Sequence, residues 1–388
     1  MDLTFFFVPF LILLSVNVFY YFIFVLASKI KIKKIPFYGL GPLKIAVLIP
    51  AYKEDGVIVS VAEKALEQQY PSTNYDVVVI ADSLQEETMH KLRQLPIQVI
   101  KVDFEKSTKT KSINAALGQL PSNYDIAMVL DADNVMAHDV LEKVNHAFQG
   151  GCRAVQAHRV AKNDNNAMAI LDGISEEINN TIFRKGHVRL GLSCALIGSG
   201  MAFEFNLFKD QMAKIQAIGG FDKELELRLL KDRIKIHYLE DALVFDEKVA
   251  SQQVFKKQRT RWLAAQFRYA FQSIPDATWA LLTRGKVDYF DKSFQFLLIP
   301  RLILLGIVSI GFLMALFPII PFRGWLISMA LVYGSSLLLA VPRRYFSLKA
   351  LSAIAHLPTT FISMLLALVN MKKAKNNFLH TPHQVTES

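Results

Sequence analysis

Residues 5–27 (FFFVPFLILLSVNVFYYFIFVLA) form an apolar run without a single charged side chain. At about 1.5 Å of rise per helical residue, a run of this length can cross the hydrocarbon layer of a membrane. A cleaved signal peptide is the alternative, but such a peptide carries basic residues before a shorter apolar core and a small-residue cleavage site after it. Here the basic residues follow the run, in SKIKIKK at 28–34. The sequence therefore predicts an uncleaved N-terminal transmembrane anchor over residues 1–30.

The lysines behind this run predict its orientation, because basic flanks stay on the cytoplasmic side of a membrane. We expect the N-terminus outside and the chain after Lys29 in the cytoplasm. The net charge of +10 agrees with lysines close to anionic lipid. No basic-aromatic module for nucleic acid accompanies it, so nucleic acid is not an expected partner. The prediction is an integral membrane protein, in the inner (plasma) membrane, with membrane lipids as partners.

Residues 273–371 predict interfacial and transmembrane helices. The runs 294–320 and 325–341 are typical of a transmembrane hairpin closed by PFRG, and 348–371 is a third candidate. If all three cross, the tail 372–388 (which begins with KKAK) lands outside, against the positive-inside preference. If the third lies in the interface or re-enters, the tail stays in the cytoplasm. We expect a cytoplasmic tail and three or four membrane helices in all.

Between these apolar ends, residues 43–272 alternate β-branched runs with helical patterns. This alternation predicts an α/β fold, a doubly wound and mostly parallel sheet with helices on both faces. The expected strands are 45–50, 75–81, 97–102, 124–131 and 153–159, and the expected helices are 56–69, 85–94, 110–119 and 138–148. In such sheets, ligands bind beyond the carboxyl ends of the strands. The two cysteines, Cys152 and Cys194, have no metal-ligand spacing and are expected to be reduced.

One predicted strand ends in Asp131-Ala-Asp133. Residues i and i+2 of a strand project to the same side, so both carboxylates can converge at the sheet edge. Hard oxygen ligands of this kind hold Mg²⁺ or Mn²⁺, and such a metal can bridge a diphosphate. Alone, the pattern is equally typical of a solvated acidic turn.

Two further strand ends carry acidic side chains. The first predicted strand continues as Ala51-Tyr52-Lys53-Glu54, and the second is followed by Asp82. Carboxylates at these positions can accept hydrogen bonds from the base and ribose of a nucleoside. Farther along, Lys109 and Lys111 precede a helical run and are candidate partners for phosphate oxygens. Each has an ordinary surface interpretation, but together they predict a nucleotide site at the sheet edge.

The last motif is Gln258-Arg-Thr-Arg261-Trp262. Spacings of i, i+3 and i+4 put Gln258, Arg261 and Trp262 on one face of a helix, where an amide, a cation and a flat aromatic ring can line one pocket. An amphipathic basic helix lying on the membrane surface is the alternative.

Taken in order, IPAYKE, the Asp82 strand end, DAD, IGSGMAF (197–203), AIGGF (217–221) and QRTRW resemble membrane-embedded family 2 glycosyltransferases. The resemblance is to the cellulose synthase, hyaluronan synthase and poly-N-acetylglucosamine synthase type, and it covers roughly residues 43–272. It implies a GT-A type fold and an inverting, metal-dependent transfer from a UDP-sugar donor to a growing glycan, with Mg²⁺ or Mn²⁺ as cofactor. It also implies roles for the site residues. The uridine would be bound by Ala51, Tyr52, Glu54 and Asp82, and Lys109 would help to place the donor. The ribose, diphosphate and metal would be held by Asp131 and Asp133, with Asp133 as metal ligand, and the acceptor and leaving diphosphate would be contacted by Gln258, Arg261 and Trp262.

The resemblance also implies a catalytic base, for which the segment 222–241 offers two aspartates. Asp241 follows Glu240, as the family's base follows a glutamate, but it lies only 17 residues before Gln258. Asp222 lies 36 residues before Gln258, close to the family's spacing, and it follows Gly-Gly-Phe in the family's order. We therefore assign the base to Asp222, with helix capping as its alternative role. Two features depart from the family: Phe221 stands where a glutamate precedes the base, and the loop after Gly-Gly-Phe is shorter. Asp241 is expected to be a turn residue or a group behind the site.

The tail segment Phe378–His383 resembles the gating segment of cellulose synthase, and a disordered terminus is its alternative. Three functions remain open at this stage. The first is a processive polysaccharide synthase, the reading favoured by the resemblance. The second is a single-sugar transferase to a polyprenyl-phosphate or other lipid acceptor. The third is a scaffold or sensor that binds the nucleotide without turnover.

Overall fold

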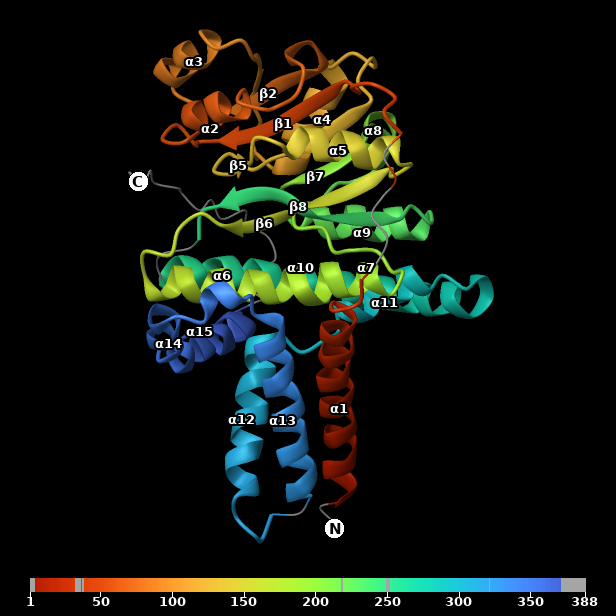
Figure 1. Ribbon diagram of the computed structural model, residues 1–388, viewed down its shortest axis with the longest axis vertical. Helices are drawn as coiled ribbons and strands as arrows, with labels where there is room; N and C mark the ends of the chain where they lie inside the picture. The colour runs from red at the N-terminus through yellow and green to blue at the C-terminus, as the bar shows by residue number, and fades with distance from the viewer. Residues whose placement is uncertain are drawn as a thin grey trace.

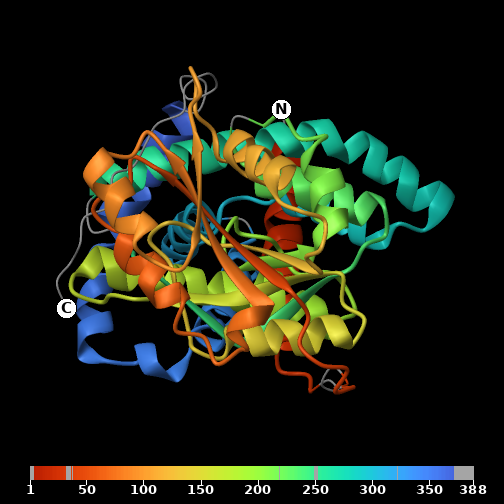
Figure 2. The same ribbon diagram turned by 90° about the horizontal axis from the view of Figure 1, so that it is seen from above.

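The computed structural model describes residues 4–31, 36, 38–217, 219–248, 252–320 and 322–370. Three levels are visible in Figure 1: an α/β sheet at the top, a layer of helices below it, and helices that project away from the sheet. Seen from above, the strands cross the middle of the molecule with helices on both sides of them (Figure 2).

The described residues form one eight-stranded sheet in the order β3-β2-β1-β4-β7-β6-β8-β5. β7 is antiparallel to both neighbours and β5 to β8, whereas the other neighbouring pairs are parallel. The expected α/β class is confirmed, but the sheet is mixed, whereas a mostly parallel sheet was expected. Its strands are β1 (Ile45–Tyr52), β2 (Tyr75–Asp82), β3 (Gln98–Val102), β4 (Ile126–Val129), β5 (Val135–Met136), β6 (Ala154–Ala161), β7 (Met201–Glu204) and β8 (Ile236–Asp246).

Alternating side chains of the central strands build a core on each face of the sheet. Ala46 and Leu48 of β1 belong to one buried cluster, and Ile45, Val47 and Ile49 to the other. Both faces are therefore covered by helices, as expected. Helices α4 (Lys109–Gln119), α8 (Phe205–Met212) and α9 (Phe221–Lys231) cover the first face, and α2 (Ile58–Ala65), α3 (Glu86–Arg93) and α5 (Val140–Gln149) the second.

A layer of long helices separates the sheet from the projecting helices (Figure 1). One is continuous through α6 (Ala167–Asn179), a π-helical stretch η2 (Asn180–Gly186) and α7 (His187–Arg189). The others are α10 (Gln252–Arg284) and α11 (Val287–Gln295). π-Helical turns are often found at functional sites, and this one adjoins the cavity described below.

The projecting helices are α1 (Thr4–Ala27), α12 (Arg301–Ala315) and α13 (Arg323–Ala340), beside α14 (Leu348–Ile354) and α15 (Leu357–Val369). In the described part of the chain, two helices are long and apolar enough to cross a membrane: 7–27 within α1, and α13. α12 is apolar but shorter than the expected span, because it begins only after Pro300. The expected third span is broken into α14 and α15 by a 50° bend, where Pro358 starts a new helix.

Helix α1 packs against both the helix layer and the hairpin of α12 and α13. The ring of Phe24 stacks on that of His187 with 3.6 Å between centroids, and the hydroxyl of Tyr21 donates to the carbonyl of Ile299 at 2.9 Å. The ammonium of Lys29 donates to the carbonyl of Leu339, the penultimate residue of α13, at 2.8 Å. These contacts tie the N-terminal helix to the rest of the molecule.

Candidate active site

The neighbouring strands β1 and β2 are each followed by a residue with left-handed backbone. Lys53 has φ 55° and Ser83 has φ 56°, and the amide of Lys53 donates to the carbonyl of Asp82 at 3.1 Å. Residues other than glycine rarely adopt this backbone conformation, and those that do cluster at functional sites. The two turns carry the chain away from the sheet edge, and Ala51, Tyr52 and Glu54 line a cavity there.

Asp82 is the last residue of β2 and is almost fully buried. Its Oδ1 accepts from the hydroxyls of Ser83 and Ser107, each at 3.0 Å. Its buried Oδ2 has no hydrogen-bond partner among the described residues. An unpaired buried carboxylate oxygen costs free energy, so it suits a donor supplied by a ligand. Asp82 itself is not among the cavity-lining residues, whereas Ser107 is.

Asp131 and Asp133 follow β4 and both line the cavity. The fully buried Asn134 holds this turn, because its Nδ2 donates to Asp133 Oδ1 at 3.0 Å and to Asp246 Oδ1 at 2.9 Å. The hydroxyl of Ser199 bonds both to Asn134, at 2.5 Å, and to the amide of Asp131, at 2.9 Å. The two carboxylates are thus fixed by a buried polar network that sequence reasoning did not foresee.

The ammonium of Lys109, at the first position of α4, forms an ion pair with Asp131 and donates to the carbonyl of Gly198 at 2.7 Å. Lys109 lines the cavity. Lys111, its companion in the sequence, does not: its ammonium donates to the carbonyl of Lys106 at 2.8 Å on the exposed side of the helix. Of the two lysines, only Lys109 is placed to meet a ligand there.

The donor set of Asp131 and Asp133 can be compared with what a divalent cation requires. Within the described residues, no group of three or more His, Cys, Asp or Glu side chains could hold a metal ion. Mg²⁺ commonly uses one or two carboxylates and takes its remaining ligands from water and substrate phosphates. The two aspartates therefore fit a cation that binds together with a diphosphate, and not a metal held by protein alone.

Helix α9 places Asp222 at the cavity. The helix begins at Phe221, after Gly220 in left-handed backbone (φ 72°), so Asp222 lies in the first turn and not at the capping position considered from the sequence. A Cβ added at Gly198 would lie 4.0 Å from the Asp222 carboxyl carbon. No described side chain hydrogen-bonds to this carboxylate. Asp222 and Lys109 therefore both lie close to Gly198.

Asp241 lies elsewhere. It is an exposed residue within β8, in a bulge where the register with β6 jumps from Leu239 to Leu243. The expectation of a turn residue is therefore wrong, because the bulge keeps residues 240–242 inside the strand. The carbonyl of Asp241 accepts from the ammonium of Lys143 at 2.6 Å, and the residue does not line the cavity.

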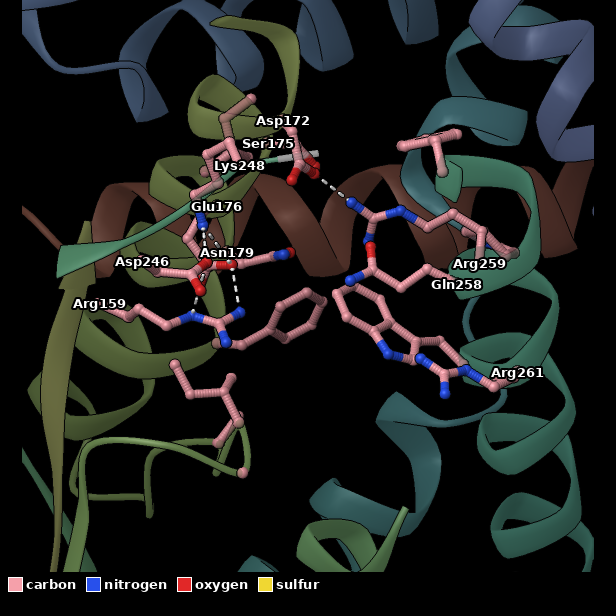
Figure 3. A pocket seen from close by; sticks show the side chains of 18 of the residues that line it. Arg159, Asp172, Ser175, Glu176, Asn179, Asp246, Lys248, Gln258, Arg259 and Arg261 are labelled. Atoms are coloured by element: carbon pink, nitrogen blue, oxygen red, sulfur yellow. Dashed lines mark hydrogen bonds and ion pairs between the residues drawn. The ribbon is translucent and has the colours of Figure 1, made fainter. Parts of the chain in front are cut away.

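Helix α10 forms the opposite wall with Gln258, Arg261 and Trp262, all of which line the cavity. The Oε1 of Gln258 is buried and accepts from no described group. Burial lowers the pKa of the Arg261 guanidinium, so a bound anion would stabilise its charge. Trp262 keeps 37% of its surface exposed, and the guanidinium of Arg259 lies 4.3 Å from the centre of its ring. Arg259, which sequence reasoning missed, also pairs with Asp172 of α6 (Figure 3).

Facing α10 across the cavity is a buried charge cluster (Figure 3). Arg159 of β6 contacts Glu176 of α6 at 2.9 Å, and Lys248 contacts Asp246 at 2.6 Å. Burial alone would raise the pKa of Glu176, but the charges of Arg159, Lys248 and Arg184 outweigh it and hold this pKa well below its ordinary value. The local sequence does not indicate that these residues are buried, because each is a charged residue of the kind typical of a protein surface.

One cavity of about 1580 Å³ connects these walls. Pockets for a single small ligand usually measure about 300–1,000 Å³, so this one has room for two substrates. Of the residues singled out in the sequence, it brings together Ala51, Tyr52, Glu54, Lys109, Asp131, Asp133, Asp222, Gln258, Arg261 and Trp262.

A family model described as "Glycosyltransferase like family 2" matches residues 42–265, more than half of the chain. The chain therefore belongs to this family, and the expected enzyme class is confirmed. A solved mannosyltransferase of Pyrobaculum calidifontis, in complex with GDP-Man and Mn²⁺, covers 85% of this chain and 96% of its own with a TM-score of 0.54. At 16% identity this likeness shows the fold alone, which is of the GT-A-like α/β kind.

Two curated relatives match the same region. A beta-monoglucosyldiacylglycerol synthase of Trichormus variabilis is 28% identical over 233 residues, which cover 56% of this chain and 48% of the relative. An N-acetylglucosaminyltransferase of Rhizobium meliloti is 24% identical over 248 residues, covering 59% of this chain and 57% of the relative. The chain thus spans about half the length of the curated relatives it matches.

Proposed function

We propose that this protein transfers a sugar, with inversion, from a UDP-sugar donor to an acceptor at the cytoplasmic face of a membrane. One observation carries the proposal: a single cavity joins three of the strand-end carboxylates (Glu54, Asp131 and Asp133) with Lys109, Asp222 and the three residues of α10. A site for binding alone would not need the carboxylate of Asp222, which accepts no hydrogen bond from a described side chain, in the same cavity as the expected diphosphate. The geometry therefore favours turnover over the scaffold or sensor considered from the sequence.

The donor would occupy the sheet edge. Asp82, together with Ala51, Tyr52 and Glu54, would hold the uridine, and the unpaired Oδ2 of Asp82 offers the acceptor oxygen that a ribose or base donor needs. Lys109 would exchange its contact with Asp131 for a phosphate oxygen. Asp131 and Asp133 would hold Mg²⁺ or Mn²⁺, with Asp133 as a ligand; when bound, such a cation neutralises the charge of the leaving diphosphate.

The acceptor would approach from the α10 side. Asp222 would take the proton of the attacking hydroxyl, since its carboxylate faces the cavity with no hydrogen bond to any other described side chain. Trp262 offers an aromatic face for the acceptor, and Arg261 with Gln258 can contact the departing diphosphate. Attack from the side opposite the leaving diphosphate inverts the anomeric carbon in one displacement.

The whole chain would be membrane-bound. We propose an anchor in 1–30, a catalytic domain in 43–272, interfacial and membrane helices in 273–371, and a cytoplasmic tail in 372–388, whose proposed gating segment lies outside the described residues. The two apolar helices support this arrangement. The name of one relative, a glucosyldiacylglycerol synthase, supports a lipid acceptor. The resemblance to polysaccharide synthases keeps processive synthesis as the other candidate.

The test is nucleotide release by the purified full-length protein in detergent or vesicles. UDP-sugars and GDP-sugars are screened with Mg²⁺, with Mn²⁺ and with a chelator. We expect UDP release from one UDP-sugar, lost with the chelator. Release of GDP alone would overturn the donor assignment, and release unaffected by the chelator would overturn the metal. Product length then separates the candidates, because one sugar per acceptor contradicts processive synthesis.

A further inference from the structure

The cavity does not end at the catalytic residues. Its lining continues past α6 and α10 to residues of α12, α13, α14 and α15. These helices lie on the far side of that layer in Figure 1. There its walls are aliphatic. We call this part the apolar trough and define it by Leu305 of α12, Leu338 of α13, Leu351 and Ile354 of α14, and Met364 of α15.

The trough lies where hydrocarbon, not water, would be the solvent. α13 is one of the two helices apolar and long enough to cross a membrane, and α14 with α15 forms the bent apolar pair beside it. Leu338 and Leu351 leave 63% and 64% of their surfaces uncovered by protein, and both line the cavity. The trough is therefore open toward the expected bilayer and continuous with the proposed reaction centre.

Two hydroxyls that line the cavity beside the trough already have partners within their own helices. The hydroxyl of Ser347 accepts from the amide of Ala350 at 3.3 Å, and that of Thr360 donates to the carbonyl of His356 at 2.8 Å. A sugar chain passing here would lose its hydrogen bonds to water without replacement, which is costly. A hydrocarbon chain makes no hydrogen bonds, so it could enter the trough from the bilayer without this cost.

We infer that the apolar trough binds a hydrocarbon chain of the acceptor, so that the acceptor is an amphiphilic lipid that enters from the bilayer. Its hydroxyl-bearing head then lies between Trp262 and Asp222, on the sheet side of the helix layer. This inference rests on the proposed function and names the substrate class of the same site. The cavity's size agrees with it, since about 1580 Å³ exceeds what a nucleotide sugar alone would need.

The experiment uses the full-length protein in phosphatidylcholine vesicles that contain a diacylglycerol with a diazirine on one acyl chain. After irradiation, adducts are mapped by mass spectrometry. We expect adducts on Leu305 or Met364, which face the trough, in addition to those on outward-facing positions. The test variant is Leu338→Trp, which fills the trough. Its control is Leu331→Trp, because Leu331 lies on the same helix with the same 63% exposure but does not line the cavity.

Leu338→Trp should lower the trough adducts about tenfold, in the range by which an apolar pocket discriminates ligands of different size, whereas Leu331→Trp should not. Thermal unfolding of both variants checks that they fold. Trough adducts that are absent, or equal in both variants, would overturn the inference.

A measurement of sugar transfer distinguishes failure of this inference from failure of the proposed function. Trough adducts without any sugar transfer would support the hydrocarbon-binding site but contradict the proposed function. Sugar transfer with a kcat/KM that does not depend on the length of the acceptor's hydrocarbon chain would contradict only this inference.

Discussion

At the scale of single residues, Asp222 and Asp241 differ in what surrounds them. Asp222 lines the cavity in the first turn of α9, whereas Asp241 is exposed in the bulge of β8. Asp222→Asn keeps the shape of the side chain but removes the base, so transfer should fall about 10²- to 10⁴-fold. Rates of UDP release, measured at saturating donor, check this.

Asp241→Asn is the matched control, because it makes the same chemical change outside the cavity and should leave the rate near that of the wild type. Equal thermal unfolding midpoints would show that both variants fold. The assignment of the base is wrong if Asp241→Asn abolishes transfer while Asp222→Asn retains it.

The buried cluster around Glu176 gives a second residue-scale prediction. Glu176→Gln leaves Arg159, Arg184 and Lys248 without this counter-charge, and breaking a buried pair costs about 3–5 kcal/mol. Because surrounding cations lower its folded-state pKa, ionised Glu176 stabilises the fold above its unfolded pKa of about 4.3, and that stability is lost as the pH falls further. Thermal unfolding of wild type and variant should therefore differ most above about pH 5, with the gap narrowing in acid.

Glu63→Gln is the control for this series, since Glu63 is exposed and forms no ion pair among the described residues. It should change the unfolding midpoint little at any pH. A gap between wild type and Glu176→Gln that stays constant into acid would contradict the role given to the charge cluster.

At the scale of elements, the packing of α9 against α10 sets where Asp222 lies. Gly220 precedes α9 with φ 72°, and a Cβ added there would lie 3.0 Å from the Cβ of Ala265 in α10. Gly220→Ala should cost about 1–2 kcal/mol for the left-handed backbone and should push the two helices apart. We expect a lower unfolding midpoint together with slower UDP release.

Gly219→Ala is the control, because a Cβ at Gly219 would meet no atom within 4 Å. It should affect neither measurement by more than about 0.5 kcal/mol of stability. Equal effects of the two alanines would show that the contact between α9 and α10 does not position the base.

The same scale shows what the sequence could predict. The strands β1, β2, β3, β4 and β6 were expected at nearly their observed places, because each is a compact apolar run between turn signals. β5 and β7 were missed, since a strand of two or four residues leaves no periodicity to read. The mixed sheet follows from them, because β7 pairs with β4 and β6 far along the chain.

Only part of the candidate site could be predicted from the sequence. The carboxylates after β1, β2 and β4 could be predicted because parallel strands end at a common edge. The partners that hold them could not, since Ser199 reaches Asn134 and Asp131 across more than sixty positions. Glu176 and Arg159 are buried only because α6 packs on β6, and no local pattern reports that burial.

At the scale of the whole molecule, the start of α1 and the link between α12 and α13 lie at the end opposite the sheet (Figure 1). Because basic flanks stay on the cytoplasmic side, the lysines after α1 lead us to expect that end outside the cell and the sheet in the cytoplasm. Thiol labelling can test this, because the native Cys152 and Cys194 are 5% and 0% exposed and should give little background. Reporter cysteines are introduced as Ile319→Cys, at a position 87% exposed in the link, and as Lys91→Cys, on the surface of α3.

With a membrane-impermeant maleimide on intact cells, Ile319→Cys should react at once and Lys91→Cys only after permeabilisation. The physical reason is that, in the proposed arrangement, α12 and α13 carry the link through the bilayer while α3 stays with the sheet on the lysine side. Labelling in detergent shows that both thiols are reactive, so a silent position reports location and not burial. The reverse pattern would put the sheet outside the cell, away from cytoplasmic nucleotide sugars, and would contradict both the orientation and the proposed donor supply. Labelling of both positions in intact cells would contradict the membrane-spanning role of α12 and α13.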